Sequence, residues 1–294
     1  MTTYHSTTNL SNHFYLFVYK YFIDSFPLNK YKLWLKGIGM LSLQVNSKEK
    51  LLLGAIQLPS FLIKNSSDIN RIGDYAASNA LKFKESGFDG VFIQDTTIGD
   101  LSMDVLANLT SITRHVKDIV GEDFAIGSQM ECDNAKAILA TAKAASCEMV
   151  RIKNYVGALL KSNGVLPGQG PEAFKYKIEH GIDTNIFADI FNLTGVPVGN
   201  LSFEAACGMA LKLGVSGLIV CGKGFDETIS LLKRGKDSNP NAFILCGGNA
   251  TEKNVKEILK VCDGVIVSSC LKTEDKKEWD ITKTKRFVDN AKNC

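Results

Sequence analysis

The chain has 294 residues, with 34 lysines and arginines against 31 aspartates and glutamates, for a formal net charge of +3. This balance, together with the lack of a basic cluster interleaved with aromatic residues, argues against a nucleic-acid-binding surface. A hydrophobic content of 45% suffices for a large core, and the length suits a single α/β barrel, since such barrels commonly run to about 250 residues.

Cysteine and histidine usage narrows the chemistry. Eight cysteines occur without a C-x-x-C pair, and most fall within expected strands or helices. This pattern is typical of a reducing compartment, so we expect a cytoplasmic protein, with a mitochondrial location as the alternative. The four histidines all lie away from the expected strand ends, which argues against a histidine-based zinc site or a Ser-His-Asp triad. No metal site is predicted, and no cofactor is assigned.

The first fifty residues differ from the rest of the chain. We expect residues 1–50 to form an N-terminal extension that packs on a barrel made by residues 51–294. Segment 14–26 (FYLFVYKYFIDSF) is rich in aromatic residues but is interrupted by Lys20 and Asp24. It is too short and too charged for a membrane span, which needs about 20 apolar residues. We predict no transmembrane segment, with peripheral membrane contact as a minority interpretation.

From residue 51 onward, short apolar runs alternate with amphipathic helical patterns. Strands are expected at residues 52–58, 88–95, 124–129, 149–154, 185–190, 217–221, 243–246 and 265–268. Helices are expected at residues 69–85, 101–120, 133–146, 202–213, 226–233, 251–261 and 282–291. Eight expected strands, seven of them followed by an expected helix, with right-handed crossovers favour a closed (β/α)8 TIM barrel over an open doubly wound sheet.

The connection after the fourth strand is unusually long. Residues 155–170 include five residues of glycine or proline, among them Gly157, Gly164 and Gly168. We interpret this segment as a lid over the carboxyl ends of the strands, with a flexible insertion as the alternative.

Charged residues at the ends of the fourth and fifth strands are candidates for catalysis or binding. Strand alternation places Arg151 and Lys153 on the inner face, and Asp189 on the inner face of the next strand. Arg151 is either a ligand clamp or a structural cation. Lys153 could bind phosphate, form an imine or lie in water at the rim. Asp189 could pair with either cation, bind Mg²⁺ or act as a base.

Further polar residues complete a ring at the strand ends. Asp95 follows the second strand and is a third candidate for acid/base chemistry, while Gln57 and Gln129 end the first and third strands. Amides at such positions orient hydroxyl groups of a ligand. Gly222, after the sixth strand, lies in a short Cys-Gly-Lys-Gly turn that resembles an anion-binding loop.

The last two strands suggest a phosphate site. Strand seven ends in Gly247, Gly248 and Asn249, and strand eight ends in Ser268 and Ser269. Neighbouring strands of a barrel deliver their loops to one place, where backbone N–H groups and a helix N-terminus can bind a phosphate. The alternative is that these small residues only turn the chain.

From residue 51 to the C-terminus, the sequence resembles the BtpA family. The resemblance is carried by residues 263–267 (DGVIV) together with Leu271, Lys272 and Trp279, by residues 247–251 (GGNAT), and by residues 149–152 (MVRI) and 188–190 (ADI). The family implies a TIM-barrel fold, and members have been linked to photosystem I biogenesis in photosynthetic cells. Otherwise they look like small-molecule barrels of unsettled chemistry.

The chain departs from the family pattern at three places. Gln129 and residues 132–135 (CDNA) stand where members carry Asn and Arg-Asn-Asp-Ala, residues 161–164 (KSNG) replace Thr-Asp-Gln-Gly, and Leu193-Thr194 replaces a Lys-His pair. The first hypothesis is a barrel that binds a small phosphorylated metabolite, a sugar phosphate or nucleotide, with acid/base chemistry. The departures favour the alternative, a non-catalytic assembly or biogenesis factor. Whether the protein is an enzyme, and whether copies associate, stays open.

Overall fold

The computed structural model describes residues 50–59, 68–97, 99–161, 164–191 and 193–292. The chain divides into two units, Met1–Leu41 and Ser42–Cys294. The expected N-terminal extension lies outside the described residues except for Lys50. None of the helices in the described ranges is both long and apolar enough to cross a membrane.

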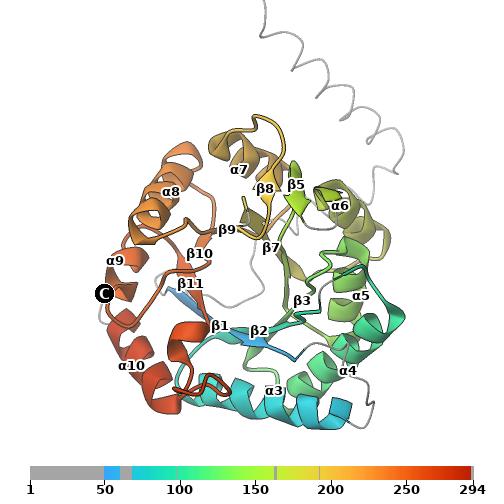
Figure 1. Ribbon diagram of the computed structural model, residues 1–294, viewed down its shortest axis with the longest axis vertical. Coiled ribbons are helices and arrows are strands. Elements are labelled where there is room, and N and C mark those ends of the chain that lie inside the picture. Colours follow the sequence, from blue (N-terminus) through green and yellow to red (C-terminus); the bar gives the residue numbers. More distant parts are fainter. Residues whose placement is uncertain (1–49, 60–67, 98, 162–163, 192, 293–294) are drawn as a thin grey trace, which may run out of the picture. The chain divides into compact units, whose positions relative to one another are not determined.

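A closed barrel of parallel strands forms the second unit, with helices around it (Figure 1). Its strands, in spatial order, are β1 (Leu51–Gln57), β11 (Gly264–Val267), β10 (Ile244–Cys246), β9 (Gly217–Val220), β7 (Asn185–Ile190), β4 (Met149–Ile152), β3 (Ala125–Gln129) and β2 (Gly90–Gln94). The surrounding helices are α3 (Asp68–Glu85), α4 (Met103–Val120), α5 (Ala135–Ala145), α6 (Gly170–Glu179), α7 (Phe203–Lys212), α8 (Phe225–Ser238), α9 (Val255–Leu259) and α10 (Ile281–Lys292). The predicted TIM barrel is confirmed.

Strand alternation separates two hydrophobic cores. Inside the barrel, residues from all eight strands meet, among them Leu53, Phe92 and Phe187. The phenyl rings of Phe92 and Phe187 pack edge to face. Residues of the opposite parity, such as Val91 and Ile186, form the larger core between the strands and the helices. Burying both faces of each strand is the usual arrangement in a parallel sheet and explains the continuous apolar runs in the sequence.

Two inward-facing glycines make room for the interior aromatic rings. A Cβ atom at Gly127 would lie 2.5 Å from the ring of Phe92, and one at Gly217 would lie 2.7 Å from the ring of Phe187. Both distances are far below van der Waals contact. The small residues on β3 and β9 therefore allow one large ring on each neighbouring strand.

Three carboxylates lie at the amino-terminal end of the barrel, where the strands begin. Asp89 accepts a hydrogen bond from the N–H of Leu52 (2.7 Å), Glu148 accepts one from Ile126 (2.8 Å), and Asp263 accepts one from Ile244 (2.7 Å). In each case, the carboxylate just before one strand accepts a hydrogen bond from an N–H group near the start of the neighbouring strand. The recurring acidic residue before a strand thus satisfies backbone donors that the parallel ladder leaves open.

The connection after β4 is folded, not irregular. Strands β5 (Ala158–Lys161) and β6 (Gly164–Pro167) form an antiparallel hairpin, and β8 (Val196–Pro197), from the loop after β7, adds a third strand. We call this three-stranded sheet the flap. The glycines at 157 and 164 have φ values of +77° and +108°, which suits a hairpin's entry and turn better than a long loop.

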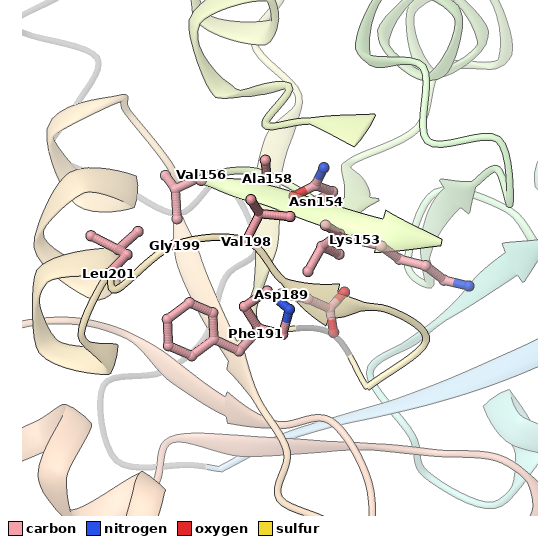
Figure 2. A pocket seen from close by; sticks show the side chains of 12 residues that line it. Lys153, Asn154, Val156, Ala158, Asp189, Phe191, Val198, Gly199 and Leu201 are labelled. Atoms are coloured by element: carbon pink, nitrogen blue, oxygen red, sulfur yellow. The ribbon is translucent and has the colours of Figure 1, made fainter. Parts of the chain in front are cut away.

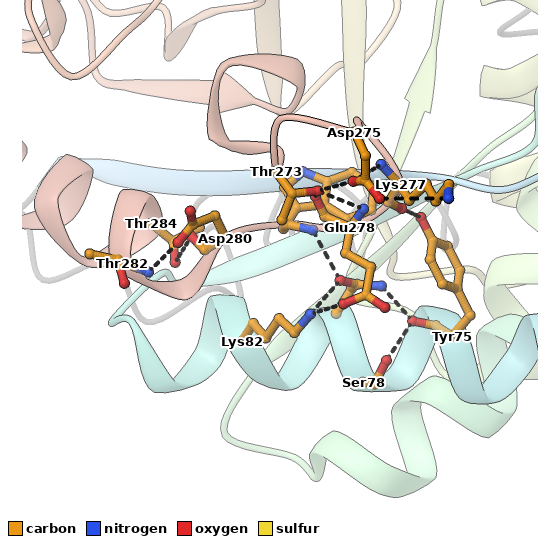
Figure 3. A network of polar contacts seen from close by, with 12 residues as sticks. Tyr75, Ser78, Lys82, Thr273, Asp275, Lys277, Glu278, Asp280, Thr282 and Thr284 are labelled. Atoms are coloured by element: carbon orange, nitrogen blue, oxygen red, sulfur yellow. Dashed lines mark hydrogen bonds and ion pairs between the residues drawn. The ribbon is translucent and has the colours of Figure 1, made fainter.

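A second loop, residues 272–279, fastens the end of β11 to α3 (Figure 3). Lys272 and Trp279 form a short antiparallel bridge that closes it. The hydroxyl of Tyr75 donates to the carbonyl of Lys277 (2.6 Å), and Lys82 pairs with Glu278 (2.6 Å). We call this loop the strap.

Lys117 is 1% exposed, and its ion pairs allow a test of how much the carboxylates at the amino-terminal end of the barrel contribute to stability. Its ammonium lies 2.6 Å from Glu148 and 3.3 Å from Glu122, whose side chain is 90% exposed. Glu148→Gln should lower the free energy of unfolding by about 1–3 kcal/mol, because the buried cation loses its counter-charge. Glu122→Gln should change it by less than about 0.5 kcal/mol. Urea denaturation measures both, and equal effects would contradict this assignment.

Candidate functional site

Three glutamines stand side by side at the carboxyl ends of β1, β2 and β3. Gln57 pairs in register with Gln94, and Gln94 with Gln129. All three share the parity of the barrel interior, because Ala55 and Phe92 belong to the inner core. Gln94 was missed in the sequence analysis, although counting two residues on from Phe92 would have found it.

Asp95, one residue later, has a different setting from the one expected. It is 1% exposed, and its carboxylate accepts hydrogen bonds from the backbone N–H of Thr97 (2.9 Å) and of Glu131 (3.4 Å). These bonds order the loops after β2 and β3. The structure therefore does not bring Asp95 into the glutamine row.

Gln129 leaves one buried donor without a partner. Its side chain is 1% exposed, and its Nε2 has no hydrogen-bond partner among the described residues. A buried amide group without a partner costs about 1–3 kcal/mol. Such a group at a strand end is a natural place for a ligand oxygen to bind.

Arg151 and Asp189 form a buried ion pair between β4 and β7. Arg151 Nε and Nη2 donate to the two carboxylate oxygens of Asp189, each at 2.8 Å, and the side chains are 12% and 6% exposed. Burial disfavours the guanidinium charge, but the charge and hydrogen bonds of Asp189 outweigh it and hold the pKa of Arg151 above its ordinary value. The sequence predicted both residues on the inner face, and the structure joins them.

Lys153 pairs with Glu131, a residue that the sequence analysis did not select. The Lys153 side chain is 12% exposed, and Glu131 lies in the loop after β3. The signal for Glu131 was weak, since it lies two residues beyond the end of its strand. At this side of the barrel, each of the two cations therefore has its own carboxylate.

Asp133 binds the backbone just after the end of β4. Its carboxylate accepts hydrogen bonds from the backbone N–H groups of Lys153 (2.8 Å) and Asn154. Burial raises the pKa of Asp133 to about 6, against the partial compensation of these two N–H donors, and the charge of Asp189 adds to the rise. This carboxyl group thus changes charge close to neutral pH.

The glycine-rich loops after β9 and β10 are tied together. The N–H of Gly247 donates to the carbonyl of Val220 (2.9 Å), and the N–H of Gly222 donates to Thr228 Oγ1 (3.0 Å). The Asn249 amide donates to the carbonyl of Gly222 (2.8 Å) and to Thr228 Oγ1 (3.0 Å). The Asn249 side chain and these two N–H groups are therefore engaged within the protein.

Other backbone donors, in the loop after β10 and in the turn after β11, are open. Among the described residues, the N–H groups of Gly248, Asn249 and Ser269 have no acceptor. The strands that carry them, β10 and β11, are neighbours in the barrel. The helix after β10 is shorter than expected, with α9 spanning only Val255–Leu259, so its dipole adds little positive charge here. The Ser268 hydroxyl donates to the carbonyl of Ala55 (2.7 Å).

A narrow pocket lies between the flap and the ends of β4 and β7 (Figure 2). Lys153, Asn154 and Asp189 line it, together with Phe191 and the flap residues Ala158 and Leu159. Its inner volume of about 10 Å³ is about the room that one water molecule needs. Ala158 and Leu159 of the flap thus form one wall of the pocket that Asp189 lines.

The described residues contain no cluster of side chains suited to bind a metal ion. Among the described residues, no group of three or more His, Cys, Asp or Glu side chains is arranged to hold a metal ion. The seven described cysteines are free thiols.

The sequence matches known relatives over most of its length. The model of the BtpA family matches residues 48–293. An uncharacterized protein of Archaeoglobus fulgidus is 28% identical over 231 residues, covering 76% of this chain and 92% of the relative. The photosystem I biogenesis protein BtpA of Synechocystis is 22% identical over 213 residues, covering 70% and 74%.

Solved structures with the same fold are distant in sequence. A phosphoribosyl anthranilate isomerase from Thermus thermophilus aligns with a TM-score of 0.54 at 9% identity, covering 83% of this chain and 98% of that one. A 3-hexulose-6-phosphate synthase from Salmonella typhimurium aligns with a TM-score of 0.54 at 12% identity, covering 83% and 99%. At this identity, the likeness establishes the fold.

The pKa of Asp133 predicts a pH-dependent stability. The pKa of an aspartate is ordinarily 3.8, and that of Asp133 in the folded protein is about 6. Between these two pH values the folded protein keeps a proton that the unfolded chain has lost, so the free energy of unfolding falls as pH rises through this window. Asp133→Asn should remove this trend. From pH 4 to pH 7, the parent should therefore lose on the order of 3 kcal/mol of unfolding free energy relative to the variant. Urea denaturation at several pH values measures it.

Asp237→Asn, on the exposed face of α8, is the matched control and should leave the pH profile of the parent unchanged. A difference between the parent and Asp133→Asn that stays constant with pH would contradict the assignment.

Proposed function

The chain belongs to the BtpA family, and we propose that its barrel binds a small phosphorylated metabolite, a sugar phosphate or nucleotide, at the carboxyl ends of the strands. The open N–H groups of Gly248, Asn249 and Ser269 carry this proposal. They lie at the ends of adjacent strands, and several converging N–H groups are a common way to bind a phosphate. The phosphate would lie above β10 and β11.

Two further features support a polar ligand. The Gln129 amide provides a buried donor without a partner, in a row with Gln57 and Gln94. Amides of this kind bind hydroxyl or carbonyl groups. Two structures with this fold, a phosphoribosyl anthranilate isomerase and a 3-hexulose-6-phosphate synthase, bear names that agree with a phosphorylated sugar. Gly222 and Gly247 contribute shape, because their N–H groups are engaged.

Acid/base chemistry is the second part of the proposal. Asp189 and Lys153 line the pocket beneath the flap, where Asp189 would accept a proton and the Lys153 ammonium would donate one. Their partners, Arg151 and Glu131, would hold the two side chains in place and stabilise the opposite charges. Asp95 would act from the loop behind them by positioning Glu131 through its backbone. A cytoplasmic location is in keeping with the free thiols.

The second candidate function is that of a non-catalytic assembly factor. Leu160, Val165 and Val196 lie directly opposite one another on the three strands of the flap and are 49%, 58% and 65% exposed. Exposed apolar patches often take part in protein contacts. One relative carries the name of a photosystem I biogenesis protein, which agrees with such a role.

Ser269→Asp tests the phosphate site. It places a carboxylate beside the open N–H groups on an exposed residue, whereas a side chain at Gly248 would have its Cβ 2.7 Å from Cys221 Sγ. Inorganic phosphate and ribose 5-phosphate should raise the melting temperature of the parent, since a ligand at 100 times its Kd stabilises by about 2.7 kcal/mol. Ser269→Asp should lose most of this shift, because like charges repel.

Ser230→Asp, exposed on α8, adds the same charge away from the strand ends and should keep the full shift. If neither compound, nor any in a library of phosphorylated metabolites, stabilises the parent, the proposal of a phosphorylated ligand is wrong. If Ser269→Asp binds as tightly as the parent, the phosphate site lies elsewhere.

A further inference from the structure

Lys272 lies just beyond the proposed phosphate site without a counter-charge. It follows the short 3-10 turn Ser269–Leu271 at the end of β11. Its ammonium lies 4.5 Å from the ring centre of Trp279 and 3.4 Å from Gln57 Oε1. Among the described residues, no carboxylate forms an ion pair with it.

The two cations at the end of β4 are already neutralised. Arg151 makes two hydrogen bonds to Asp189, and Lys153 pairs with Glu131. An additional anion would have to break into these pairs to reach either charge, and breaking a buried pair is costly. Within the described part of the chain, the Lys272 ammonium contacts an amide oxygen and an aromatic ring and no carboxylate, so its charge is available to a ligand.

The strap holds Lys272 in position. The backbone of Lys272 pairs with that of Trp279, and the Trp279 side chain is 1% exposed and packs against Phe83 with ring centres 6.0 Å apart. The strap is in turn fastened to α3 through Tyr75 and Lys82 (Figure 3). A lysine whose ammonium rests on an indole ring has fewer conformations to lose on binding, which favours affinity.

The loop of Lys272 also adjoins the open backbone donors. Ser269 is three residues earlier in the same turn, and the Lys272 N–H donates to the Ser269 carbonyl (3.3 Å). The ends of β11 and β1 are neighbours, joined by pairing of Gly54 with Val267 and by the hydrogen bond from Ser268 to Ala55. The ammonium beside Gln57 and the N–H of Ser269 thus belong to the same corner of the barrel mouth.

We propose that Lys272 provides the positive charge that binds the phosphoryl group of the ligand, between the end of β1 and the Ser269 turn. This inference rests on the function proposed above and adds a residue that determines specificity for a charged over a neutral ligand. Partial burial lowers the pKa of Lys272 from its ordinary value, as expected for a cation whose charge is not yet compensated. An ammonium on a flexible stem binds phosphate as a point charge.

The orientation of the ligand follows from this placement. With its phosphoryl group at the β11–β1 corner, the uncharged part of the molecule would extend across β1, β2 and β3. There it would meet the row of Gln57, Gln94 and Gln129. Among the described residues, Gln129 Nε2 has no hydrogen-bond partner and is available to the ligand. A hydroxyl-rich sugar suits such a row, because each hydroxyl can both donate and accept.

Lys272→Met, which keeps an unbranched apolar side chain but removes the charge, tests this inference. Binding of inorganic phosphate and of ribose 5-phosphate is measured by isothermal titration at low and at physiological salt. The variant should bind both about tenfold more weakly or worse, as expected for losing a charged hydrogen bond. It should also lose much of the salt dependence of the parent. Lys272→Arg should retain binding within about threefold, because it keeps the charge.

Lys285→Met, on the exposed face of α10, is the control with the same change of net charge, and it should bind like the parent. If Lys272→Met does not fold, Lys272→Gln replaces it, and circular dichroism establishes that each variant is folded. Equal affinity of the parent and of the folded charge-free variant would overturn the inference, as would equal weakening in Lys285→Met.

The experiment also separates this inference from the function on which it rests. A parent that binds none of the phosphorylated compounds overturns both. A parent whose binding is lost in Ser269→Asp but kept in Lys272→Met retains the phosphate site and overturns only the role of Lys272.

Discussion

Closure of the barrel between β1 and β11 is the constraint on which the other features depend. The pairing of Leu51–Gly54 with Gly264–Val267 joins the first strand to the last and leaves no open edge in the sheet. Once the sheet is closed, every second residue must face the interior, and all eight carboxyl ends meet at one mouth. A shift of β1 by one residue relative to β2 would turn Gln57 outward and separate it from Gln94 and Gln129.

Charge is distributed unevenly around that mouth. The side formed by β4 and β7 holds two ion pairs, Arg151 with Asp189 and Lys153 with Glu131, so both of these cations already have a carboxylate partner. The side formed by β10, β11 and β1 offers open N–H groups and Lys272 without a carboxylate. An anionic group is therefore favoured on one side, while the other supplies paired acids and bases. This division is suited to a ligand with a charged end and a neutral reactive end.

The sequence predicted the architecture well because the barrel depends on periodicity. Strand order, the inward faces of β4 and β7 and the position of most helices follow from alternating and helical patterns. The partners of individual side chains do not. Glu131 lies beyond the end of β3, so no periodicity indicates that it meets Lys153. The flap was interpreted as an irregular lid because glycines at 157 and 164 weaken the strand pattern, whereas their positive φ angles allow the hairpin.

The flap connects the two functional candidates. Its inner residue Leu159 is 3% exposed and lies over the pocket with Asp189, while its outer row, with Leu160, faces solvent. Movement of this one sheet would both open the pocket and displace the apolar row. A protein bound to that row would hold the flap in one position and so change access to Asp189. Ligand binding and assembly are therefore not exclusive in this fold, because both act on the same three short strands.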